Sequence, residues 1–334
     1  MRFKNNYIIT NTREQFQNES KLSSTPYSDH PSQASVDFII SELYKVGFEA
    51  CFYGGVESLI EACEKKMTFK DTLFLNFSDG LSHKSRKAQS AILLELLGVP
   101  YAGSEPLARL MAGNKAYTKR IVSEWLNTPR GITVFKKSAI PPNIEFPVIV
   151  KPNREGSSMG ITQESICKSK QDLHRQLPSL LERFQEVLIE EYIEGYEITC
   201  FIIGNKGRYF LTEPIVCEYN GIRYFKDFVF GLEEKANRTR KEYLAQNFLK
   251  SSEIEMIRRA TQTAFEALGM NDFARADFRL RKDGCLFFIE INGNAVISET
   301  SELGIISKEL GIPFGKIVGD IILSATERFS IIHG

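Results

Sequence analysis

The fold of this chain is decided by the stretch Ala274-Arg275-Ala276-Asp277-Phe278-Arg279-Leu280 and by the stretch Phe287-Phe288-Ile289-Glu290-Ile291-Asn292 that follows it. Both are apolar runs interrupted by polar residues, and a polar turn joins them, so they predict an antiparallel hairpin. Side chains alternate between the two faces of a strand, and pairing of the strands can bring Asp277, Glu290 and Asn292 to one side. Two carboxylates and an amide suit Mg²⁺, which takes its remaining ligands from substrate phosphates. A surface hairpin is the alternative, but the flanking apolar residues favour burial.

The bulk composition excludes several classes of protein. The chain has 334 residues, enough for two or three packed units, and 42 basic against 42 acidic residues. The zero net charge argues against a nucleic-acid-binding protein, which normally carries a basic surplus. No apolar run reaches membrane-spanning length, the first residues lack a signal-peptide core, and the six cysteines form no C-x-x-C pair. We therefore expect a cytoplasmic protein with reduced thiols that does not bind membranes.

Hydrophobic periodicity predicts an α/β protein. Strands alternate with helices up to about residue 113, the pattern of a parallel sheet. The expected strands span residues 7–9, 72–77, 146–151 and 187–190, and the expected helices span 33–46, 85–97, 115–125 and 252–268. The polar segment 14–32 interrupts the pattern and is expected to be a long loop or a mobile flap, and the sequence leaves its role open.

A lysine followed by a Gly/Ser loop is the second strong signal. Lys151 ends an apolar strand, and residues 152–160 contain two glycines and the pair Ser157 and Ser158. Glycines let backbone N–H groups approach phosphate oxygens, and serine hydroxyls add donors. The spacing is neither that of a Walker A loop nor that of a dinucleotide fingerprint. Such a loop can also be a plain turn, but the acidic hairpin farther along the chain favours a phosphate-binding role.

Two further segments are candidates for nucleotide contacts. Lys115 adds a second cation at a helix start, whereas Lys119 and Arg120 are expected on a solvated helix face. Residues 190–193 close a strand and offer backbone groups to a purine edge, and Glu197 offers a carboxylate to a ribose hydroxyl. A plain strand end with exposed acidic residues would have a similar sequence. The local sequence therefore does not distinguish it from a nucleotide contact.

Together these segments resemble the ATP-grasp superfamily, and within it the D-alanine–D-alanine ligase-like branch. The resemblance covers residues 73–323 and rests on residues 94–104, 114–115, 148–160, 187–192, 275–279 and 290–292. It implies a three-domain ATP-grasp fold with ATP clamped between the second and third domains. The implied domains are an N-terminal parallel α/β substrate domain (1–112), a central α+β subdomain (113–196) and a C-terminal α+β subdomain with the Mg²⁺ site (197–334).

The resemblance also implies roles for single residues, with ATP and two Mg²⁺ ions (replaceable by Mn²⁺) as cofactors. The implied nucleotide-binding residues are Lys115, Lys151, Ser157, Ser158, Glu190, Glu191, Tyr192, Ile193 and Glu197. The implied metal ligands are Asp277, Glu290 and Asn292, and the implied catalytic residues are Arg275, Ser158 and Lys226, with Arg275 on an acyl-phosphate intermediate. In such enzymes ATP phosphorylates a carboxylate, and an amine attacks the acyl phosphate to give an amide, ADP and phosphate.

The departures from this branch concern the substrate side. Residues 76–82 replace a His-Gly and Gly-Glu-Asp-Gly stretch, and residues 293–301 replace a Pro-Gly-Met-Thr type turn. The N-terminal Gly-rich segment and its glutamate are not evident. Ser301 stands where a serine can bind the carboxylate of the second substrate, and Lys226 stands in an altered lid loop of uncertain register.

These departures lead us to expect a ligase of specialised metabolism. It would join an activated carboxylate, or a vinylogous carboxylate as in mycosporine-like amino acid synthesis, to the amine of a small amino acid. The alternatives are a true D-alanine–D-alanine ligase of cell-wall synthesis and a catalytically degenerate nucleotide-binding regulatory protein. The expected partners are these small molecules; relatives usually dimerise through the N-terminal domain, but no residue pattern shows a homodimer here. The sequence leaves both substrates and the oligomeric state open.

Overall fold

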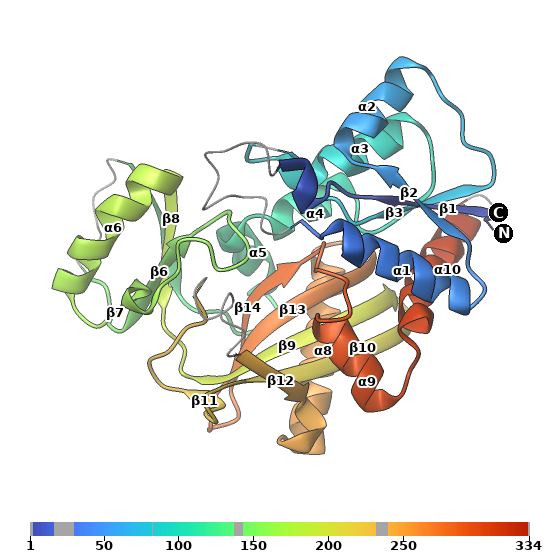
Figure 1. Cartoon of the computed structure of the whole chain (residues 1–334). Helices are drawn as coiled ribbons and strands as arrows, with labels where there is room; N and C mark the ends of the chain where they lie inside the picture. Colours follow the sequence, from blue (N-terminus) through green and yellow to red (C-terminus); the bar gives the residue numbers. More distant parts are fainter. Residues whose placement is uncertain (1–2, 17–29, 82, 137–142, 232–239, 333–334) are drawn as a thin grey trace.

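The computed structural model describes residues 3–16, 30–81, 83–136, 143–231 and 240–332, which build three β-sheets with helices around them (Figure 1). The first sheet is parallel, in the order β2 (Ala50–Gly54), β1 (Asn5–Ile9), β3 (Thr72–Asn76) and β4 (Tyr101–Ala102). Its helical segments are η1 (Arg13–Phe16), α1 (Gln33–Lys45), α2 (Val56–Glu64), η3 (Arg86–Ala88), α3 (Gln89–Leu96) and α4 (Pro106–Ala112). The predicted parallel α/β start of the chain is therefore confirmed.

A small antiparallel sheet follows in the chain. Its order is β5 (Gly131–Phe135), β8 (Glu186–Glu191), β6 (Val148–Pro152) and β7 (Ile166–Cys167). Helix α5 (Lys115–Val122) precedes this sheet, and η4 (Gln163–Ser165) and α6 (Lys170–Phe184) lie between its strands in the chain. Leu173 and Leu177 of α6 pack on strand residues such as Val150 and Ile189, so this sheet has its own apolar core.

The third sheet is antiparallel and larger. Its order is β12 (Arg240–Leu244), β10 (Arg208–Tyr219), β9 (Gly195–Asn205), β13 (Asp272–Leu280) and β14 (Leu286–Asn292), with β11 (Tyr224–Phe225) paired to β9. The helical segments η5 (Ala245–Asn247), α8 (Ser251–Ala267), α9 (Glu302–Leu310) and α10 (Phe314–Ile332) belong to the same part of the chain. Apolar residues of α8, including Ile257 and Phe265, pack on one face of this sheet against Phe278 and Phe288.

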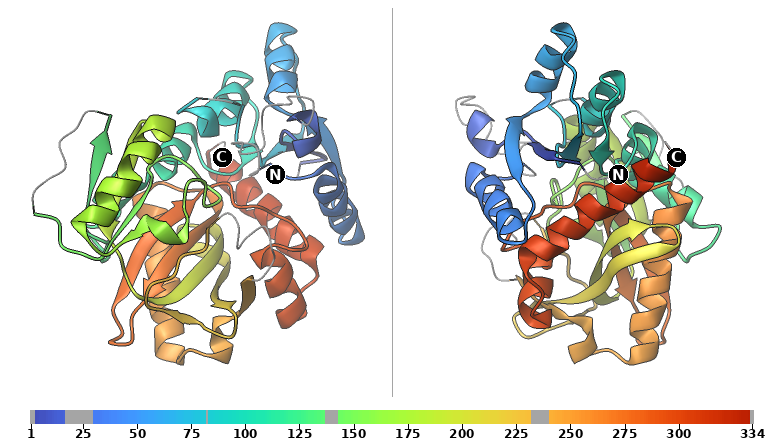
Figure 2. Two further views of the ribbon diagram at one scale, coloured as in Figure 1. Left: turned by 60° about the vertical axis from the view of Figure 1, so that its left-hand side comes forward. Right: turned by 90° about the vertical axis from the view of Figure 1, so that its right-hand side faces the viewer.

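The C-terminal helix α10 links the first and third sheets. Figure 2 shows it, in red, between the blue N-terminal part and the strands of the large sheet, and it contacts both α1 and β9. Ile317 and Ile321 of α10 share one buried apolar cluster with Leu43 of α1 and Phe201 of β9. The domain boundaries that we place at residues 112 and 196 stay a prediction.

The predicted strands and helices are present, but the sequence analysis did not predict several others, among them β2, α2, α4, α6, α9 and α10. The side chains of the edge strand β2 are mostly only half-buried and lack a clear period. Two of the predicted helices differ in their bounds. The helix expected from residue 85 begins as the 3-10 turn η3, and the helix expected to reach residue 125 ends at Val122. Of the expected loop 14–32, residues 17–29 lie outside the described residues.

Strand β13 is paired on both sides over nearly its whole length. It pairs with β9 from Asp272 to Leu280, and with β14 in a register that sets Asp277 opposite Glu290. A bulge after Asp277 interrupts the second ladder. The predicted hairpin is present, and the surface alternative is excluded because Phe278 and Phe288 are buried against α8.

The first residue of β13 is a buried junction between three parts of the fold. Asp272 is fully buried, and its backbone has a φ of 64°, in the left-handed region. Its carboxylate accepts hydrogen bonds from the Gly103 backbone N–H at 2.9 Å, Asn205 Nδ2 at 2.9 Å, Ser324 Oγ at 3.0 Å and Arg328 Nη2 at 2.7 Å. This one carboxylate therefore connects the end of β4, the end of β9 and helix α10.

We predict that Asp272→Asn lowers the free energy of unfolding by about 3–5 kcal/mol, because Arg328 loses its buried counter-charge. Asparagine tolerates the left-handed backbone, so the loss reports the charge rather than strain. Urea denaturation measures the effect. The control is Glu327→Gln, whose ion pair with Arg208 is exposed and whose loss is expected to change stability by less than about 0.5 kcal/mol. If Asp272→Asn changes the free energy of unfolding no more than the control does, the role of Asp272 as a junction is contradicted.

Candidate active site

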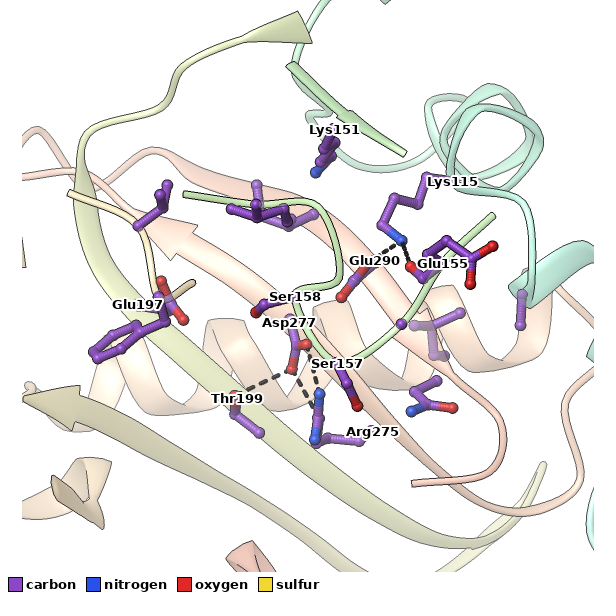
Figure 3. Close-up of a pocket in the computed structure, with 18 of the residues that line it drawn as sticks. Lys115, Lys151, Glu155, Ser157, Ser158, Glu197, Thr199, Arg275, Asp277 and Glu290 are labelled. Carbon is purple, nitrogen blue, oxygen red and sulfur yellow. Dashed lines mark hydrogen bonds and ion pairs between the residues drawn. The ribbon is translucent and has the colours of Figure 1, made fainter. Parts of the chain in front are cut away.

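A cavity of about 200 Å³ lies between strands of the second and third sheets (Figure 3), and Asp79, which follows β3 of the first sheet, also lines it. Its walls include Lys151 and the loop 154–158 after β6, the segment 190–193 at the end of β8, and polar residues of β13 and β14. Most of the residues that the sequence analysis selected line it: Lys115, Lys151, Ser157, Ser158, Glu190, Glu191, Tyr192, Ile193, Glu197, Arg275, Asp277, Glu290 and Asn292. A concave site with convergent polar groups is the usual form of a ligand site.

One side of the cavity is built on a buried glutamate held by two lysines. Glu190 Oε1 lies 2.6 Å from Lys151 Nζ, and Glu190 Oε2 lies 3.1 Å from Lys119 Nζ. Lys119 Nζ also donates to the Ile289 carbonyl, because α5 packs against β14. The expectation that Lys119 is solvated is therefore wrong, whereas Arg120 is exposed as expected. The Glu190 carboxylate therefore binds these two lysines instead of facing the purine base of a nucleotide.

Burial and the neighbouring charges shift the pKa values of Lys119 and Glu190 in opposite directions. Burial holds the pKa of Lys119 down to about 8, although the Glu190 carboxylate opposes this shift. Burial alone would raise the pKa of Glu190, but Lys119 and Lys151 outweigh it and keep that pKa below its usual value. The glutamate is therefore ionised, and the trio carries one net positive charge near neutral pH.

Lys115 connects the Gly/Ser loop with the acidic hairpin. Its Nζ donates to the Glu155 carbonyl and lies 3.1 Å from Glu290 Oε2 (Figure 3). The helix start that carries it is capped by Asn114, whose side chain accepts the Tyr117 N–H. Burial would raise the pKa of Glu290, but the neighbouring lysines, Lys115 first, hold it well below its usual value.

Arg275 and Asp277 form the floor of the cavity (Figure 3). The guanidinium donates to both oxygens of Asp277, at 3.1 Å from Nε and 3.0 Å from Nη2, and its Nη1 lies 3.0 Å from Glu302 Oε1. Thr199 Oγ1 donates to Asp277 at 3.1 Å. Burial, with the Glu290 charge adding to it, raises the pKa of Asp277 although Arg275 opposes the shift. Arg275 is thus oriented by two carboxylates before any ligand binds.

The side-chain oxygens of the hairpin suit Mg²⁺ as part of a coordination shell that phosphate oxygens complete. Asp277 and Glu290 are directly opposite across β13 and β14, and Arg275 is opposite Asn292. Within the described part of the chain, no cluster of three or more His, Cys, Asp and Glu side chains could hold a metal unaided. Two carboxylates and one amide fit an ion that takes further ligands from phosphate and water.

The opposite end of the cavity has apolar walls. Tyr192 and Ile193 are buried, and the Tyr192 hydroxyl donates to the Phe228 carbonyl at 2.9 Å. Glu197 forms an ion pair with Arg279 at 2.6 Å, so its carboxylate already has a partner. Apolar walls of this kind are typical of sites for small organic ligands.

Two predicted residues are not at this cavity. Lys226 lines another cavity, of about 380 Å³, with Phe146 and Asp227, because β11 pairs with the start of β9 and Lys168 binds Asp227 at 2.8 Å. Ser301 is the N-cap residue before α9 (Glu302–Leu310), and its hydroxyl donates to the Ser298 carbonyl at 2.7 Å. In this conformation neither residue lines the cavity, and the roles expected for Lys226 and Ser301 stay predictions.

Other residues of the cavity were not selected from the sequence. They are polar residues contributed by several elements, namely Asp79, Lys87, Arg154, Thr199 and Arg240. Asp79 stands in the divergent segment 76–82, and Arg154 stands in the Gly/Ser loop 152–160. Lys87, Thr199 and Arg240 have no motif around them and reach the cavity only through the fold.

Comparison with known proteins identifies the family. The family model described as D-ala D-ala ligase C-terminus matches residues 125–323. A D-alanine–D-alanine ligase of Aquifex aeolicus is 34% identical over 235 residues, which span 69% of this chain and 75% of that protein. The chain belongs to the D-alanine–D-alanine ligase family. A second ligase of this name, from Thermotoga petrophila, is 29% identical over 85% of this chain and 88% of its own length.

Solved structures of similar proteins have the same fold. The D-alanine–D-alanine ligase of Bacillus anthracis complexed with ATP has a TM-score of 0.73 at 23% identity, over 99% of this chain and 100% of that one. The VanG D-Ala:D-Ser ligase of Enterococcus faecalis has a TM-score of 0.70 at 19% identity, over 97% and 100%. The predicted ATP-grasp fold class is confirmed.

Family membership makes this chain an ATP-dependent, ADP-forming ligase that forms a C–N bond. The catalytically degenerate alternative is therefore not supported. The expected role in specialised metabolism gains no support from these relatives either, which favour the D-alanine–D-alanine ligase alternative.

Among the described helices, none has the length and apolar character needed to cross a membrane.

We predict that affinity for ATP falls about tenfold between pH 7 and pH 9, because Lys119 loses its charge as the pH rises through about 8. Over this range the unfolded chain still binds the proton that the folded chain releases, so this group makes folding more favourable as pH rises and unfolding does not explain the loss. Calorimetric titration with a non-hydrolysable ATP analogue measures the affinity. Lys119→Arg is expected to flatten the profile, and Arg120→Gln to leave it unchanged. An equally steep profile in Lys119→Arg contradicts this assignment.

Proposed function

We propose that the protein is a Mg²⁺- and ATP-dependent ligase that joins two D-alanine molecules, or D-alanine and a second small amino acid, into a dipeptide. The observation that carries the proposal is the convergence of Lys115, Lys151, Asp277, Glu290 and a Gly/Ser loop on one cavity. The named activity of the similar proteins supports D-alanine as the first substrate to test.

The Gly/Ser loop has a backbone suited to phosphate binding. Ser157 and Ser158 both have positive φ angles, 46° and 58°, which are uncommon for residues other than glycine. Runs of such conformations direct successive N–H groups toward one point and form anion-binding concavities. We expect this loop to cover the ATP phosphates, while Lys115 and Lys151 neutralise their charge.

Asp277, Glu290 and Asn292 would hold Mg²⁺ between the hairpin and the phosphates. The ion would supply charge neutralisation on the transferred phosphoryl group. Lys115 already lies 3.1 Å from Glu290, so this carboxylate stays ionised and available as a ligand.

The chemistry then follows from how the chain holds its groups. The carboxylate of the first amino acid takes the γ-phosphoryl group, which gives an acyl phosphate and ADP. The second amino acid loses an ammonium proton, its amine attacks the acyl carbon, and phosphate leaves. Arg275 would lie against the acyl phosphate, and its ion pairs with Asp277 and Glu302 fix the guanidinium in advance, so little reorganisation is needed.

A different second amino acid is the other candidate. Glu302 places a buried carboxylate on Arg275, and the segment 293–301 before it departs from the family pattern. These changes lie next to the region where the second substrate would bind, so they favour variation in the acceptor amino acid rather than in the activated one. A homodimer and the replacement of Mg²⁺ by Mn²⁺ stay predictions.

We predict that D-alanine with Mg²⁺ and ATP gives ADP, phosphate and D-alanyl-D-alanine in equal amounts. Coupled detection of ADP and chromatography of the product, across D-alanine paired with other amino acids, measure this. Asp277→Asn and Glu290→Gln are each expected to lower kcat at least about a hundredfold. Each variant loses a carboxylate that we assign to Mg²⁺, and without the ion the phosphate charge is no longer neutralised.

The matched control is Asp283→Asn in the exposed turn of the same hairpin, which is expected to keep full activity. Turnover retained in both cavity variants contradicts the assigned metal site. Absence of ADP release with every amino acid pair contradicts the proposed reaction.

A further inference from the structure

A further cavity, of about 250 Å³, lies next to the cavity of the candidate active site. The two cavities share a wall, because Lys87, Gly113, Arg154 and Glu155 line both. The other described residues that line this basic cavity are His83, Lys84, Arg86, Arg109, Leu110, Pro152, Phe184 and Glu186. None of these described residues has a role in binding ATP, Mg²⁺ or an amino acid in the proposed function.

The walls of the basic cavity carry an excess of positive charge. Five lysine and arginine side chains line it against two glutamates. One of the glutamates is already compensated, since Glu186 Oε2 lies 2.7 Å from Arg154 Nε and Glu186 Oε1 accepts a hydrogen bond from Asn153 Nδ2 at 2.5 Å. Glu186 therefore does not neutralise the other cations of the wall.

Two lysines bring their charge to this cavity from the turn before α3. Lys84 is exposed and lines the basic cavity alone, whereas Lys87 is half-buried and lines both cavities. Neither lysine forms an ion pair with a carboxylate in the described part of the chain. A lysine ammonium has three donors and no acceptor, so a ligand in contact with these lysines has to supply acceptor oxygens.

The basic wall is held in place by contacts to the main chain. Arg109 is only 1% exposed, and its Nε donates to the Lys87 carbonyl at 2.6 Å while its Nη2 donates to the Ser78 carbonyl. Arg86 Nη1 donates to the Asp79 carbonyl at 3.2 Å. These bonds join the lysine-bearing turn to α4 and to the loop after β3, so a ligand meets cations that are already positioned.

The shared wall connects this cavity to the place where phosphate would be formed. Arg154 and Glu155 belong to the Gly/Ser loop that we assign to the ATP phosphates, and the Glu155 carbonyl accepts a hydrogen bond from Lys115 Nζ. In the proposed reaction a phosphate ion leaves the acyl carbon on the active-site side of this wall. The cations of the basic cavity attract such an ion.

We propose that the basic cavity binds a phosphate ion and receives the one that the reaction releases. The size of the cavity fits a small oxyanion, and its charge favours one with several negative charges. Lys87, which lines both cavities, would contact the ion on its way between them. Only the source of the phosphate rests on the proposed function, because the cavity and its charge do not depend on the reaction.

The first test titrates inorganic phosphate into protein loaded with Mg²⁺ and a non-hydrolysable ATP analogue, so that a triphosphate occupies the active-site cavity. Calorimetry is expected to show one phosphate bound per wild-type chain. Lys84→Glu is expected to weaken phosphate binding at least about tenfold and Lys84→Gln about threefold. Both variants are expected to keep nucleotide affinity within about twofold, because Lys84 does not line the active-site cavity.

The matched control is Lys308→Glu on α9, which makes the same charge change at an exposed residue that does not line the basic cavity. It is expected to keep wild-type affinity for phosphate. Absence of phosphate binding by wild type overturns the inference. Equal weakening in Lys84→Glu and Lys308→Glu also overturns it, because the effect would then report net charge alone.

A second measurement tests the source of the phosphate. Added phosphate is expected to slow ADP formation by wild type in a way that more ATP does not relieve, and Lys84→Glu is expected to need about tenfold more phosphate for the same effect. Phosphate that binds but leaves turnover unchanged overturns the assignment to the released product. ADP formation with D-alanine decides the proposed function separately, and phosphate binding is measured without turnover, so the two can fail independently.

Discussion

The register of β13 between β9 and β14 is the constraint on which the rest of the structure depends. One strand carries the junction residue Asp272 at its start, Asp277 in its middle and Arg279 near its end. Because side chains alternate along a strand, a slip of one residue would turn every one of these groups to the opposite face. Pairing on both edges prevents that slip, and it fixes the distance between the junction with α10 and the cavity.

Charge compensation is the second constraint. The cavity brings buried lysines from α5 and β6 against carboxylates from β8 and β14, as in the pairs Lys151–Glu190 and Lys115–Glu290. Such pairs contribute little net stability because desolvation offsets their attraction. They do hold charged groups in fixed positions, and a preorganised set of charges is what phosphoryl transfer requires of a protein.

Local patterns were sufficient for much of this protein. The hairpin of β13 and β14, the strand and loop around Lys151, and the parallel start of the chain all follow from periodicity and turn residues. The differences have tertiary causes. Lys119 was expected to be solvated, but it is buried because α5 packs on β14. The pairing of β11 with β9 places Lys226 at another cavity, and the Ser301 hydroxyl donates to the Ser298 carbonyl; the roles of these two residues stay predictions.

By itself the sequence determined which residues could serve a nucleotide and a metal, because their chemistry and spacing are local properties of strands and loops. It did not determine what surrounds them. The ion pair of Arg275 with Glu302 and the walls of the basic cavity depend on contacts between segments far apart in the chain. Only the tertiary structure decides such contacts, because burial and the neighbouring charges, rather than residue type, set whether a charged side chain is a counter-ion, a metal ligand or a contact for a bound anion.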